Sequence, residues 1–538
     1  MTPIESAARE IIEQLLRNEI TDEKALNAAK KAVSIRYKLS SLLGNSQILA
    51  AALTDAEKQQ VLQRLLLKPV RTISGVAVIA AMTSPAACPH GLCIPCPGGI
   101  ASKFNSPQSY MGAEPAAKRA FENNFDPYLQ VSSRLKQLEQ IGHSIAKAEL
   151  IVMGGTYTSR TLCYQEWFVK RCIEAMNDFD GIEWRKGREY VTVEDVQSAN
   201  ESASVRNVGI TIETRPDWTK KEHIDTILEL GATKVEIGVQ STYDFILAGI
   251  QRGHTVLESA NANMRLRDSG LKVGFHMMPG LPGSSVDSDL RMFKRLFEDE
   301  RFMPDYLKIY PTLVTEGTRL HGMWELGNFA PLDVLDGVEL LAKIKSILPK
   351  WVRLQRIQRD IPAYQVLAGI RKSNIRQLAS ERLKEMGGKC KCIRCREVGH
   401  RELSGIKPEN IELMVEKYRA CGGTEHFISY EDQVKDVLIG FLRLRFPAAP
   451  HRPELEGAAI VRELHVYGSM VAPGEDAGIS QWQHRGYGEE LLLRAQELAK
   501  NEGFDKIAVT SGIGVRDYYR KFGYVREGPY MIKKIDIL

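Results

Sequence analysis

The feature that most limits the fold is an alternation of short β-type runs with longer amphipathic runs between about residues 75 and 310. The six predicted strands are residues 76–81, 148–153, 208–213, 234–239, 272–277 and 306–310. The amphipathic segments 220–230, 255–269 and 286–299 have the length that a crossover helix needs. Six such units predict a parallel sheet or partial barrel, in which the chemistry is carried at the carboxyl ends of the strands.

The chain has a further region on each side of this array. With 538 residues, 43% of them apolar and 26% charged, the sequence predicts a soluble globular protein with at least two independent cores. Residues 4–67 show helical periodicity, and the last 135 or so residues show strands at 437–444, 459–467 and 506–510 around a helix at 488–500. No apolar run approaches the ~20 residues of a membrane span, so no membrane association is expected.

Three of the nine cysteines, Cys88, Cys93 and Cys96, are spaced Cys-x4-Cys-x2-Cys directly after the first predicted strand. Three thiolates within nine residues can hold three irons of a four-iron, four-sulfur (4Fe-4S) cluster and leave the fourth iron open to S-adenosylmethionine. The alternative is a structural zinc site with His90 as its fourth ligand. The position after the first strand of a βα array favours the iron–sulfur cluster. Clustered rather than paired cysteines also indicate a reducing compartment, the cytoplasm.

This loop resembles the one that supplies the cluster in the radical S-adenosylmethionine superfamily, although the commonest spacing there is Cys-x3-Cys-x2-Cys. The resemblance implies a glycine-rich edge against the methionine amino group and polar side chains against its ribose and carboxylate. The positions that it implies here are Gly154, Gly155, Thr156, Glu213 and Gln240. In the alternative interpretation, Glu213 or Gln240 pairs with a nearby arginine such as Arg215.

Near the C-terminus, the strand-like run Glu463-Leu-His-Val-Tyr-Gly-Ser469 precedes Gln483-His-Arg-Gly-Tyr-Gly488, which opens an apolar helix. A Gln-x-x-Gly-x-Gly turn before a helix can point several backbone amides at a pyrophosphate, at the positive end of the helix dipole. The order resembles the acetyl-CoA motif of the GNAT acetyltransferases, and residues 515–524 resemble their second helix. That resemblance implies that Tyr518 or Tyr519 lies near the CoA sulfur, to protonate a leaving thiolate or to pack on the cofactor.

A second cluster, Cys390-x-Cys392-x2-Cys395, offers three soft ligands. His400 is the predicted fourth ligand of a tetrahedral site, and Cys421 is the alternative. A structural zinc is favoured over a second iron–sulfur cluster because a Cys3His set closes the coordination. Three free thiols are the remaining interpretation.

The net charge of +5 is small for the length, but it is unevenly distributed. Residues 350–401 hold 14 Lys and Arg against 4 Asp and Glu, so the remainder of the chain is net acidic. A concentrated basic segment is typical of a protein that holds a nucleic acid by its phosphates.

Four segments resemble the family of the catalytic subunit of Elongator: residues 88–99, 210–217, 463–468 and 528–531. This similarity extends from about residue 68 to the C-terminus and indicates a prokaryotic single-chain relative. The family installs a carboxymethyl-type group at carbon 5 of the wobble uridine of transfer RNAs, so the resemblance implies a transferase that binds the tRNA anticodon loop. It further implies that a 5′-deoxyadenosyl radical takes a hydrogen from the methyl group of acetyl-CoA and that the carbon radical adds to the uracil.

The family resemblance also assigns residues to the acetyl-CoA site. They are Glu463, Leu464, His465, Val466, Tyr487, Gly488, Glu489 and Tyr519. Lys147, just before the second predicted strand, matches a family lysine attributed to acetyl-CoA contact from the radical domain. By position alone, Lys147 is an ordinary surface lysine.

The expected fold class is α/β, with a partial (β/α)6 barrel and a GNAT-fold domain after a helical segment. The expected regions are a basic helical segment that can contact tRNA over 1–71, the radical domain over 72–349, a basic linker with zinc-type cysteines over 350–401, and the acetyltransferase domain over 402–538. Two other functions are open: a protein (lysine or histone) acetyltransferase with a structural radical domain, and a non-catalytic RNA-binding scaffold. Partner subunits are possible but are not required by the sequence.

Overall fold

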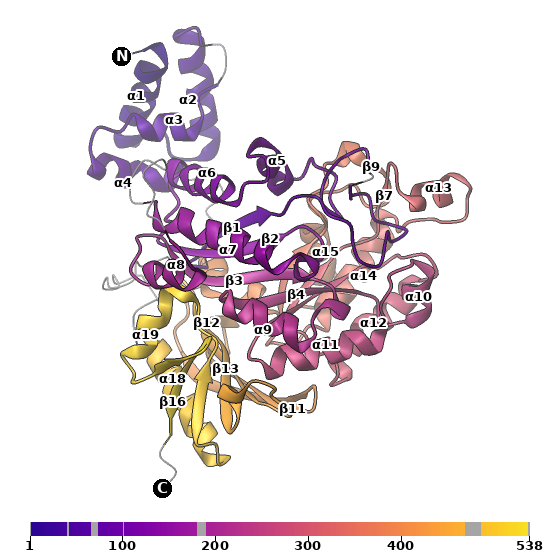
Figure 1. The fold of residues 1–538 in the computed structure, drawn as a ribbon. Coiled ribbons are helices and arrows are strands. Elements are labelled where there is room, and N and C mark those ends of the chain that lie inside the picture. Colours follow the sequence, from indigo (N-terminus) through magenta and orange to yellow (C-terminus); the bar gives the residue numbers. More distant parts are fainter. Residues whose placement is uncertain are drawn as a thin grey trace.

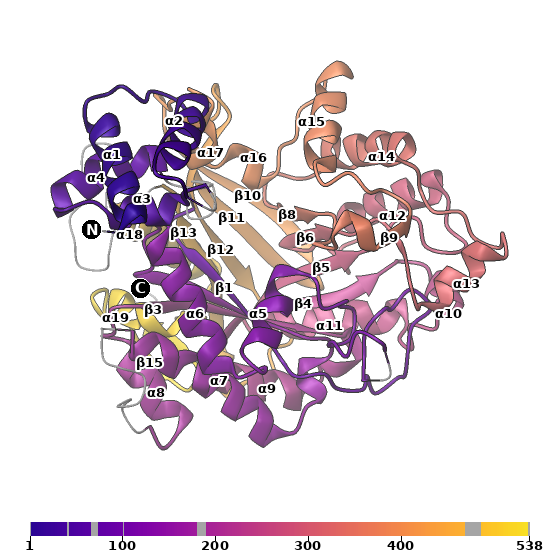
Figure 2. The ribbon, with the colours of Figure 1, turned by 90° about the horizontal axis from the view of Figure 1, so that it is seen from above.

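The computed structural model describes residues 2–39, 42–65, 74–100, 102–179, 190–468 and 486–535. The expected partial barrel is present as a half-barrel of seven parallel strands in chain order, with helices packed on its outer face (Figures 1 and 2). The strands are β1 (Ala77–Met82), β2 (Lys147–Met153), β3 (Arg206–Thr214), β4 (Ala232–Gln240), β5 (Lys272–Met277), β6 (Tyr306–Ile309) and β8 (Arg353–Ile357). The first six match the predicted strands to within two residues at each end, whereas β8 lies in the region 350–401 that the sequence suggested as a linker.

The helices between these strands include the three predicted crossover helices, α9 (Lys221–Glu229), α11 (Val256–Asp268) and α12 (Val286–Glu298). The start of α11 is fixed by a capping box, in which Thr255 accepts from the Glu258 amide and the Glu258 carboxylate accepts from the Thr255 amide. The other helices of this part are α5 (Pro115–Glu122), α6 (Pro127–Gln140), α7 (Leu162–Asn177), α8 (Val193–Asn200), α10 (Asp244–Gly249), α13 (Arg319–Glu325), α14 (Val334–Ser346), α15 (Ile375–Glu385), α16 (Ile393–Arg396) and α17 (Val398–Leu403). A small antiparallel pair, β7 (Val314–Thr315) and β9 (Val366–Ala368), lies outside the main sheet.

The N-terminal segment is helical, as its periodicity predicts. It consists of α1 (Pro3–Leu16), α2 (Glu23–Arg36), α3 (Asn45–Ala50) and α4 (Asp55–Leu65). These helices enclose an apolar core of their own, formed by residues such as Ile11, Ile12, Val33 and Ile48. In Figure 1 they stand at one end of the molecule, next to α6.

The C-terminal part is a second seven-stranded sheet, in the order β10-β11-β12-β13-β14-β16-β15. Its elements are β10 (Glu412–Ala420), β11 (Gly423–Asp432), β12 (Val437–Phe446), β13 (Ala458–Val466), α18 (Tyr487–Asn501), β14 (Lys506–Val509), α19 (Arg516–Arg520), β15 (Val525–Glu527) and β16 (Tyr530–Lys534). Only β13 and β14 run parallel; the other neighbours are antiparallel. The predicted strands and helix correspond to β12, β13, β14 and α18.

The half-barrel and the C-terminal sheet share one large core, while the N-terminal helices and the α18 side of the C-terminal sheet have apolar clusters of their own, in line with the chain length. The largest apolar cluster joins barrel residues such as Val235 and Phe275 to C-terminal residues such as Ile460 and Tyr530. A second cluster packs α18 against the other face of the C-terminal sheet. The two parts therefore bury one continuous surface against each other.

Buried ion pairs cross the same interface. Arg462 on β13 donates to both carboxylate oxygens of Asp305, at 2.6 and 2.8 Å, just before β6 begins. Arg445 on β12 lies 2.6 Å from the Asp268 carboxylate at the end of α11. Glu425 on β11 accepts from Arg267 at 2.8 Å. All these side chains are buried, so separating the two parts would leave several charges unpaired in an apolar setting.

The C-terminal sheet closes the amino-terminal edge of the half-barrel. Tyr306, the first residue of β6, hydrogen-bonds the Glu463 carboxylate on β13. Arg353, the first residue of β8, donates to the Tyr467 hydroxyl at 2.9 Å, and His465 Nε2 lies 3.0 Å from the carbonyl oxygen of Ser74, just before β1. The carboxyl ends of the barrel strands consequently point away from the C-terminal sheet. In the part of the chain that the structure describes, no helix is both long and apolar enough to cross a bilayer.

Candidate active site

The loop after β1 arranges Cys88, Cys93 and Cys96 around a cavity of about 170 Å³ at the carboxyl edge of the half-barrel. Polar groups are directed at each sulfur. The Thr156 hydroxyl lies 3.4 Å from Cys88 Sγ, Arg252 donates to Cys93 Sγ at 3.7 Å, and the Ser109 amide donates to Cys96 Sγ at 3.3 Å. Hydrogen bonds to ligand sulfurs are one of the means by which a protein tunes an iron–sulfur cluster.

The spacing of these thiols disfavours the zinc alternative. His90 Nε2 lies 3.0 Å from Cys93 Sγ, but this set is not among the groups of described residues that bring three ligand atoms within 4.8 Å of one another. A single tetrahedral zinc with bonds of about 2.3 Å needs its sulfurs only about 3.8 Å apart. Three thiols held more widely suit a larger cluster of several irons.

The glycine-rich edge follows β2. Gly154 has φ +128°, and a Cβ there would lie 2.1 Å from the hydroxyl oxygen of Thr83. Gly155 has φ +94°, and its Cβ would press on Gln108 at 3.1 Å. The two glycines let the chain turn tightly beside the cysteine loop, and Gly155 and Thr156 line the 170 Å³ cavity.

Glu213, at the end of β3, belongs to a buried charge network on the inner face of the half-barrel. Lys308 on β6 donates to Glu213 at 3.0 Å and also pairs with Glu236 on β4. Glu236 further contacts His276 Nε2 at 2.9 Å and the Lys234 ammonium at 3.7 Å. Tyr110 donates to the second oxygen of Glu213 at 3.1 Å. Burial opposes the charge on both Lys308 and Glu236, but their attraction outweighs it, so that the pKa of Lys308 is raised and the pKa of Glu236 is lowered. Glu213 therefore pairs with a lysine rather than with Arg215, which binds Asp217 at 2.9 Å.

Gln240 ends β4 in a strained conformation, with φ +68°. Its Oε1 atom is buried and has no hydrogen-bond partner among the described residues. A non-glycine residue in this region costs conformational energy that folds retain mainly at functional positions. The orphan oxygen on the cavity wall fits a polar ligand that supplies a donor, as S-adenosylmethionine does.

The predicted acetyl-CoA residues lie where two parallel strands separate. β13 pairs with β14 from Ala458 to Val461, and the pairing then ends. Glu463, Leu464, His465 and Val466 continue along β13 and line a second cavity, of about 1600 Å³. The open strand edge leaves backbone groups available to a ligand that enters between β13 and β14.

Tyr487, Gly488 and Glu489 form the first turn of α18 and line the same cavity. Gly486, with φ +88°, caps this helix. A Cβ on Gly488 would lie 2.5 Å from the Tyr518 hydroxyl, so the glycine permits a close approach of α19 to α18. The preceding motif residues Gln483, His484 and Arg485 lie outside the described residues.

Tyr518 and Tyr519 both line the large cavity from α19. Burial raises the pKa of Tyr518 to about 12 and raises the pKa of Tyr519 as well. Both hydroxyls are therefore protonated at neutral pH and can donate a hydrogen bond or a proton.

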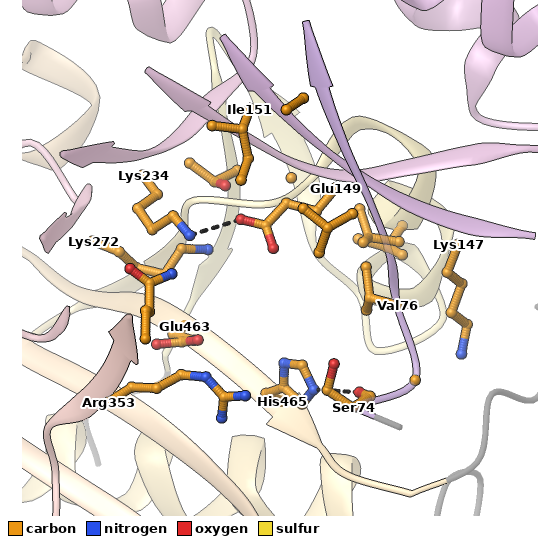
Figure 3. Close-up of a pocket in the computed structure, with 18 of the residues that line it drawn as sticks. Ser74, Val76, Lys147, Glu149, Ile151, Lys234, Lys272, Arg353, Glu463 and His465 are labelled. Carbon is orange, nitrogen blue, oxygen red and sulfur yellow. Dashed lines mark hydrogen bonds and ion pairs between the residues drawn. The ribbon is translucent and has the colours of Figure 1, made fainter. Parts of the chain in front are cut away.

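Lys147, the first residue of β2, lines the same cavity, so the structure brings it to the predicted acetyl-CoA residues of β13. Figure 3 shows Lys147 on one side of the opening and Lys272 and Lys234 on the other, with Glu463 and His465 between them. Burial lowers the pKa of Lys147 to about 8.

The two cavities adjoin through the half-barrel. Six residues line both of them: Ala116, Met153, Glu213, Lys308, Arg356 and Asp360. The inner face of a closed barrel is normally filled by branched apolar side chains, whereas this one carries Glu149, Lys234 and Lys308 around open space. The cysteine loop and the open edge of β13 thus border two adjoining cavities that share part of their lining.

The second cysteine cluster is also assembled. The Sγ atoms of Cys390, Cys392 and Cys395 lie within 4.8 Å of one another, a spacing that suits one metal ion. His400 is not part of this group of described residues; its Nε2 lies 3.1 Å from a carboxylate oxygen of Glu397. Cys421 is elsewhere, where Asn263 donates to its sulfur at 3.1 Å. The structure thus brings together the three cysteines but neither expected fourth ligand.

Several site residues are absent from the sequence predictions. Glu236, His276 and Lys272 project from barrel strands into the cavities, and Tyr110 reaches Glu213 from the cysteine loop. The only signal for them is a charged residue at every second position of an otherwise apolar strand, as in Lys234 and Glu236.

Comparison with known families gives four matches along the chain. Residues 4–73 match the ELP3 N-terminal domain, 85–296 the radical SAM superfamily, 304–385 the radical SAM C-terminal domain and 400–524 the GNAT acetyltransferase family. A tRNA uridine(34) acetyltransferase of Methanocaldococcus infernus is 49% identical over 99% of this chain and 100% of its own length. The chain belongs to the Elp3 family.

Membership of the Elp3 family extends to the eukaryotic proteins and to a solved structure. Elongator complex protein 3 of Drosophila melanogaster is 42% identical over 98% of this chain and 96% of its own length. The structure of the M. infernus Elp3 with an N-terminal deletion superposes with a TM-score of 0.75 at 47% identity, covering 86% of this chain and 100% of that one. The predicted order of a radical SAM half-barrel followed by a GNAT domain is confirmed. For this family, the radical SAM domain implies a 4Fe-4S cluster and S-adenosylmethionine, and the GNAT domain implies acetyl-CoA.

Proposed function

We propose that the protein modifies the wobble uridine of tRNA at carbon 5, using S-adenosylmethionine and acetyl-CoA bound in the two adjoining cavities. The observation that carries the proposal is the common wall of the two cavities, in which Glu213 and Lys308 face both the cysteine loop and the acetyltransferase side. A methyl group delivered from the β13 edge and a radical source held by the cysteine loop would meet inside the half-barrel, so neither domain has to move far. The printed name of the M. infernus relative, 49% identical over the whole chain, supports uridine 34 as the target.

At the carboxyl edge, Cys88, Cys93 and Cys96 would hold the cluster, and its open iron would bind S-adenosylmethionine and supply a 5′-deoxyadenosyl radical. Gly155 would lie beside the methionine group, and Gly154 lets the chain turn tightly against Thr83 to place it there. Thr156, Glu213 and Gln240 would orient the amino, carboxylate and ribose groups, because their polar atoms line the cavity and Gln240 Oε1 still needs a donor.

At the other edge, Glu463 to Val466 and the first turn of α18 would bind acetyl-CoA, with Lys147 contributing from the barrel. Tyr519, or Tyr518 beside it, would lie at the sulfur. Their protonated hydroxyls suit the donation of a hydrogen bond to the thioester sulfur or of a proton to a thiolate.

We also propose a structural zinc at Cys390, Cys392 and Cys395. Three soft ligands within 4.8 Å fit a zinc ion, and Lys345, 3.9 Å from Cys395 Sγ, offsets the thiolate charge. Cys392 is fully buried in the core shared by the two catalytic parts, so a metal here would fix the connection between β8 and the C-terminal sheet.

The basic region 350–401 would hold the anticodon loop, but only part of its charge is available. Arg353, Arg382 and Arg396 are paired with Glu397, Glu339 and Glu431. Lys372, Lys384 and Lys391 are exposed and have no ion pair to any described residue. These lysines are the best candidates for phosphate contacts. A reducing cytoplasm, where tRNA is found and thiols stay free, is the compartment that this function needs.

The proposed function is tested by anaerobic reconstitution with iron, sulfide and reductant, followed by incubation with S-adenosylmethionine, acetyl-CoA and tRNA. Nucleoside mass spectrometry should show a new uridine mass that depends on both small molecules. Cys96→Ser should abolish it, and the matched control Cys163→Ser, at an exposed cysteine outside both clusters, should not. Absence of the new mass in the reconstituted wild type would contradict the proposal.

The same reconstituted protein distinguishes the proposed function from the two alternative functions. A protein acetyltransferase would transfer radiolabel from acetyl-CoA to histone but not to tRNA. A non-catalytic scaffold would bind tRNA, and Cys96→Ser would leave the modified uridine of the cell unchanged.

A further inference from the structure

Lys272 has an unusual position among the lysines of the half-barrel. It is the first residue of β5, and its side chain lines the 1600 Å³ cavity at the edge that faces the acetyltransferase sheet. On the neighbouring strands, Lys234 pairs with Glu149 at 2.7 Å and Lys308 with Glu213 at 3.0 Å. Lys272 makes no hydrogen bond or ion pair with any residue that the structure describes.

The two carboxylates that attract the charge of Lys272 already accept hydrogen bonds from other residues. Glu463 accepts from the Tyr306 hydroxyl and from Arg443 at 2.8 Å. Glu149 accepts from Lys234 and from Thr211 at 2.9 Å. Burial lowers the pKa of Lys272, and this effect outweighs the attraction of Glu463 and Glu149 for its charge. A ligand with a hydrogen-bond acceptor would give the Lys272 ammonium the partner that the described residues do not provide.

The position of the ammonium indicates which part of a ligand it meets. Figure 3 shows Lys272 above Glu463 on the side of the opening opposite Lys147. β13 separates from β14 after Val461, two residues before Glu463, so a ligand lying in that gap points its end at the mouth of the half-barrel beside Lys272. Under the proposed function, that end is the acetyl group, whose carbonyl oxygen is its hydrogen-bond acceptor.

We propose that the Lys272 ammonium donates a hydrogen bond to the acyl carbonyl oxygen of acetyl-CoA, and so selects the acetylated cofactor over free CoA and directs its methyl group into the half-barrel. This inference deepens the proposed function and depends on acetyl-CoA binding at the β13 edge. It assigns to Lys272 a role distinct from that of Lys147, which approaches the cavity from the other side.

The test is a comparison of equilibrium binding, which needs no turnover, tRNA or iron. Isothermal titration of the full chain measures the dissociation constants of acetyl-CoA, of free CoA and of S-ethyl-CoA, a thioether that keeps the two carbons but lacks the carbonyl oxygen. Wild type should bind acetyl-CoA about 10-fold or more tightly than S-ethyl-CoA, the size of effect of one hydrogen bond from a charged donor.

In Lys272→Met the preference for acetyl-CoA over S-ethyl-CoA should fall to within about 2-fold, while free CoA binds as in wild type and shows that the site is folded. Lys272→Arg, which keeps a charged donor, should retain most of the preference. Lys521→Met, on the α19 side of the same cavity, should leave the ratio unchanged.

An unchanged ratio in Lys272→Met would overturn the inference and leave the proposed function standing, and so would an equal loss of affinity for all three ligands. Wild-type protein that binds none of the three would overturn acetyl-CoA binding itself, and with it both proposals.

Discussion

The ammonium of Lys308 lies 3.0 Å from a carboxylate oxygen of Glu213, at the wall where the two cavities meet. Lys308 also neutralises Glu236, so one lysine satisfies two buried carboxylates from two other strands. The boundary between the two cavities therefore contains an assembled charge network rather than apolar packing alone.

Replacement of Lys308 by Met should lower the free energy of unfolding by about 3 to 5 kcal/mol, because Glu213 loses its lysine partner and Glu236 keeps only the more distant Lys234, at 3.7 Å, and His276. Urea denaturation of the apo-protein measures this, with Lys308→Arg as a control that keeps the charge. The difference between wild type and Lys308→Met should shrink as the pH falls. The lowered pKa of Glu236 means that its pairing stabilises the wild type above the unfolded-state pKa and is lost on acidification. A loss below about 1 kcal/mol at neutral pH would show that the network carries little stability.

Substitution of Gly154 by Ala should impair the radical site more than its backbone conformation alone predicts. The new Cβ would lie 2.1 Å from Thr83 Oγ1, so the turn beside the cysteine loop must shift. Gly317→Ala is the matched control, since Gly317 also has positive φ, at +77°, but an added Cβ there would meet nothing within 4 Å. We expect Gly317→Ala to cost about 1 kcal/mol and Gly154→Ala about 2 kcal/mol more, with weakened S-adenosylmethionine binding only for Gly154→Ala. Equal effects of the two substitutions would refute the steric argument.

Binding of acetyl-CoA should weaken as the pH rises through about 8, because the lowered pKa of Lys147 makes it lose its positive charge in that range. Lys147→Arg, which stays charged, should bind acetyl-CoA with little change between pH 7 and pH 9. Lys272 is present in both proteins, so its own titration cancels in the comparison. Dissociation constants measured across this range by titration calorimetry check the prediction, and an identical pH profile for both proteins would contradict it.

The two cysteine clusters should lose their metals independently. Cys392→Ser should remove zinc from the purified protein and leave the iron content after reconstitution unchanged, whereas Cys93→Ser should do the reverse. Elemental analysis measures both metals in each variant, with Cys163→Ser as the control that keeps both. Zinc retained in Cys392→Ser, or iron lost from it, would show that the second cluster is not a separate zinc site.

The strands of the half-barrel could be predicted from the sequence because their outer faces are buried by helices and leave clear apolar runs. β8 was missed for a physical reason: its inward residues Arg353 and Gln355 line a cavity instead of a core, so the run Arg-Leu-Gln-Arg-Ile has the composition of a linker. A strand that borders open polar space loses the apolar alternation by which strands are recognised.

The residues of the candidate site also fall into those that the sequence predicts and those that only the fold brings together. The cysteines, Gly154 and the residues of β13 belong to short contiguous motifs, and their local spacing is enough to predict them. Lys308, Glu236 and His276 come from three different strands and meet only through the sheet register, which pairs Glu236 with Gly274 and His276 with Lys308. His400 has a suitable spacing after Cys395, but in this structure its Nε2 lies 3.1 Å from Glu397 and it is not part of the group formed by the three thiols, so its role as a ligand stays a prediction.

The central claim is that the methyl group of acetyl-CoA reaches the radical site through the half-barrel. Its most direct test uses acetyl-CoA with a trideuterated methyl group, incubated anaerobically with reconstituted enzyme, S-adenosylmethionine and tRNA. Mass spectrometry of the released 5′-deoxyadenosine should show one deuterium, and the modified uridine should retain the other two when analysed under conditions that prevent exchange. Deuterium-free 5′-deoxyadenosine formed together with modified uridine would contradict the claim, because the hydrogen would then have come from elsewhere than the acetyl group.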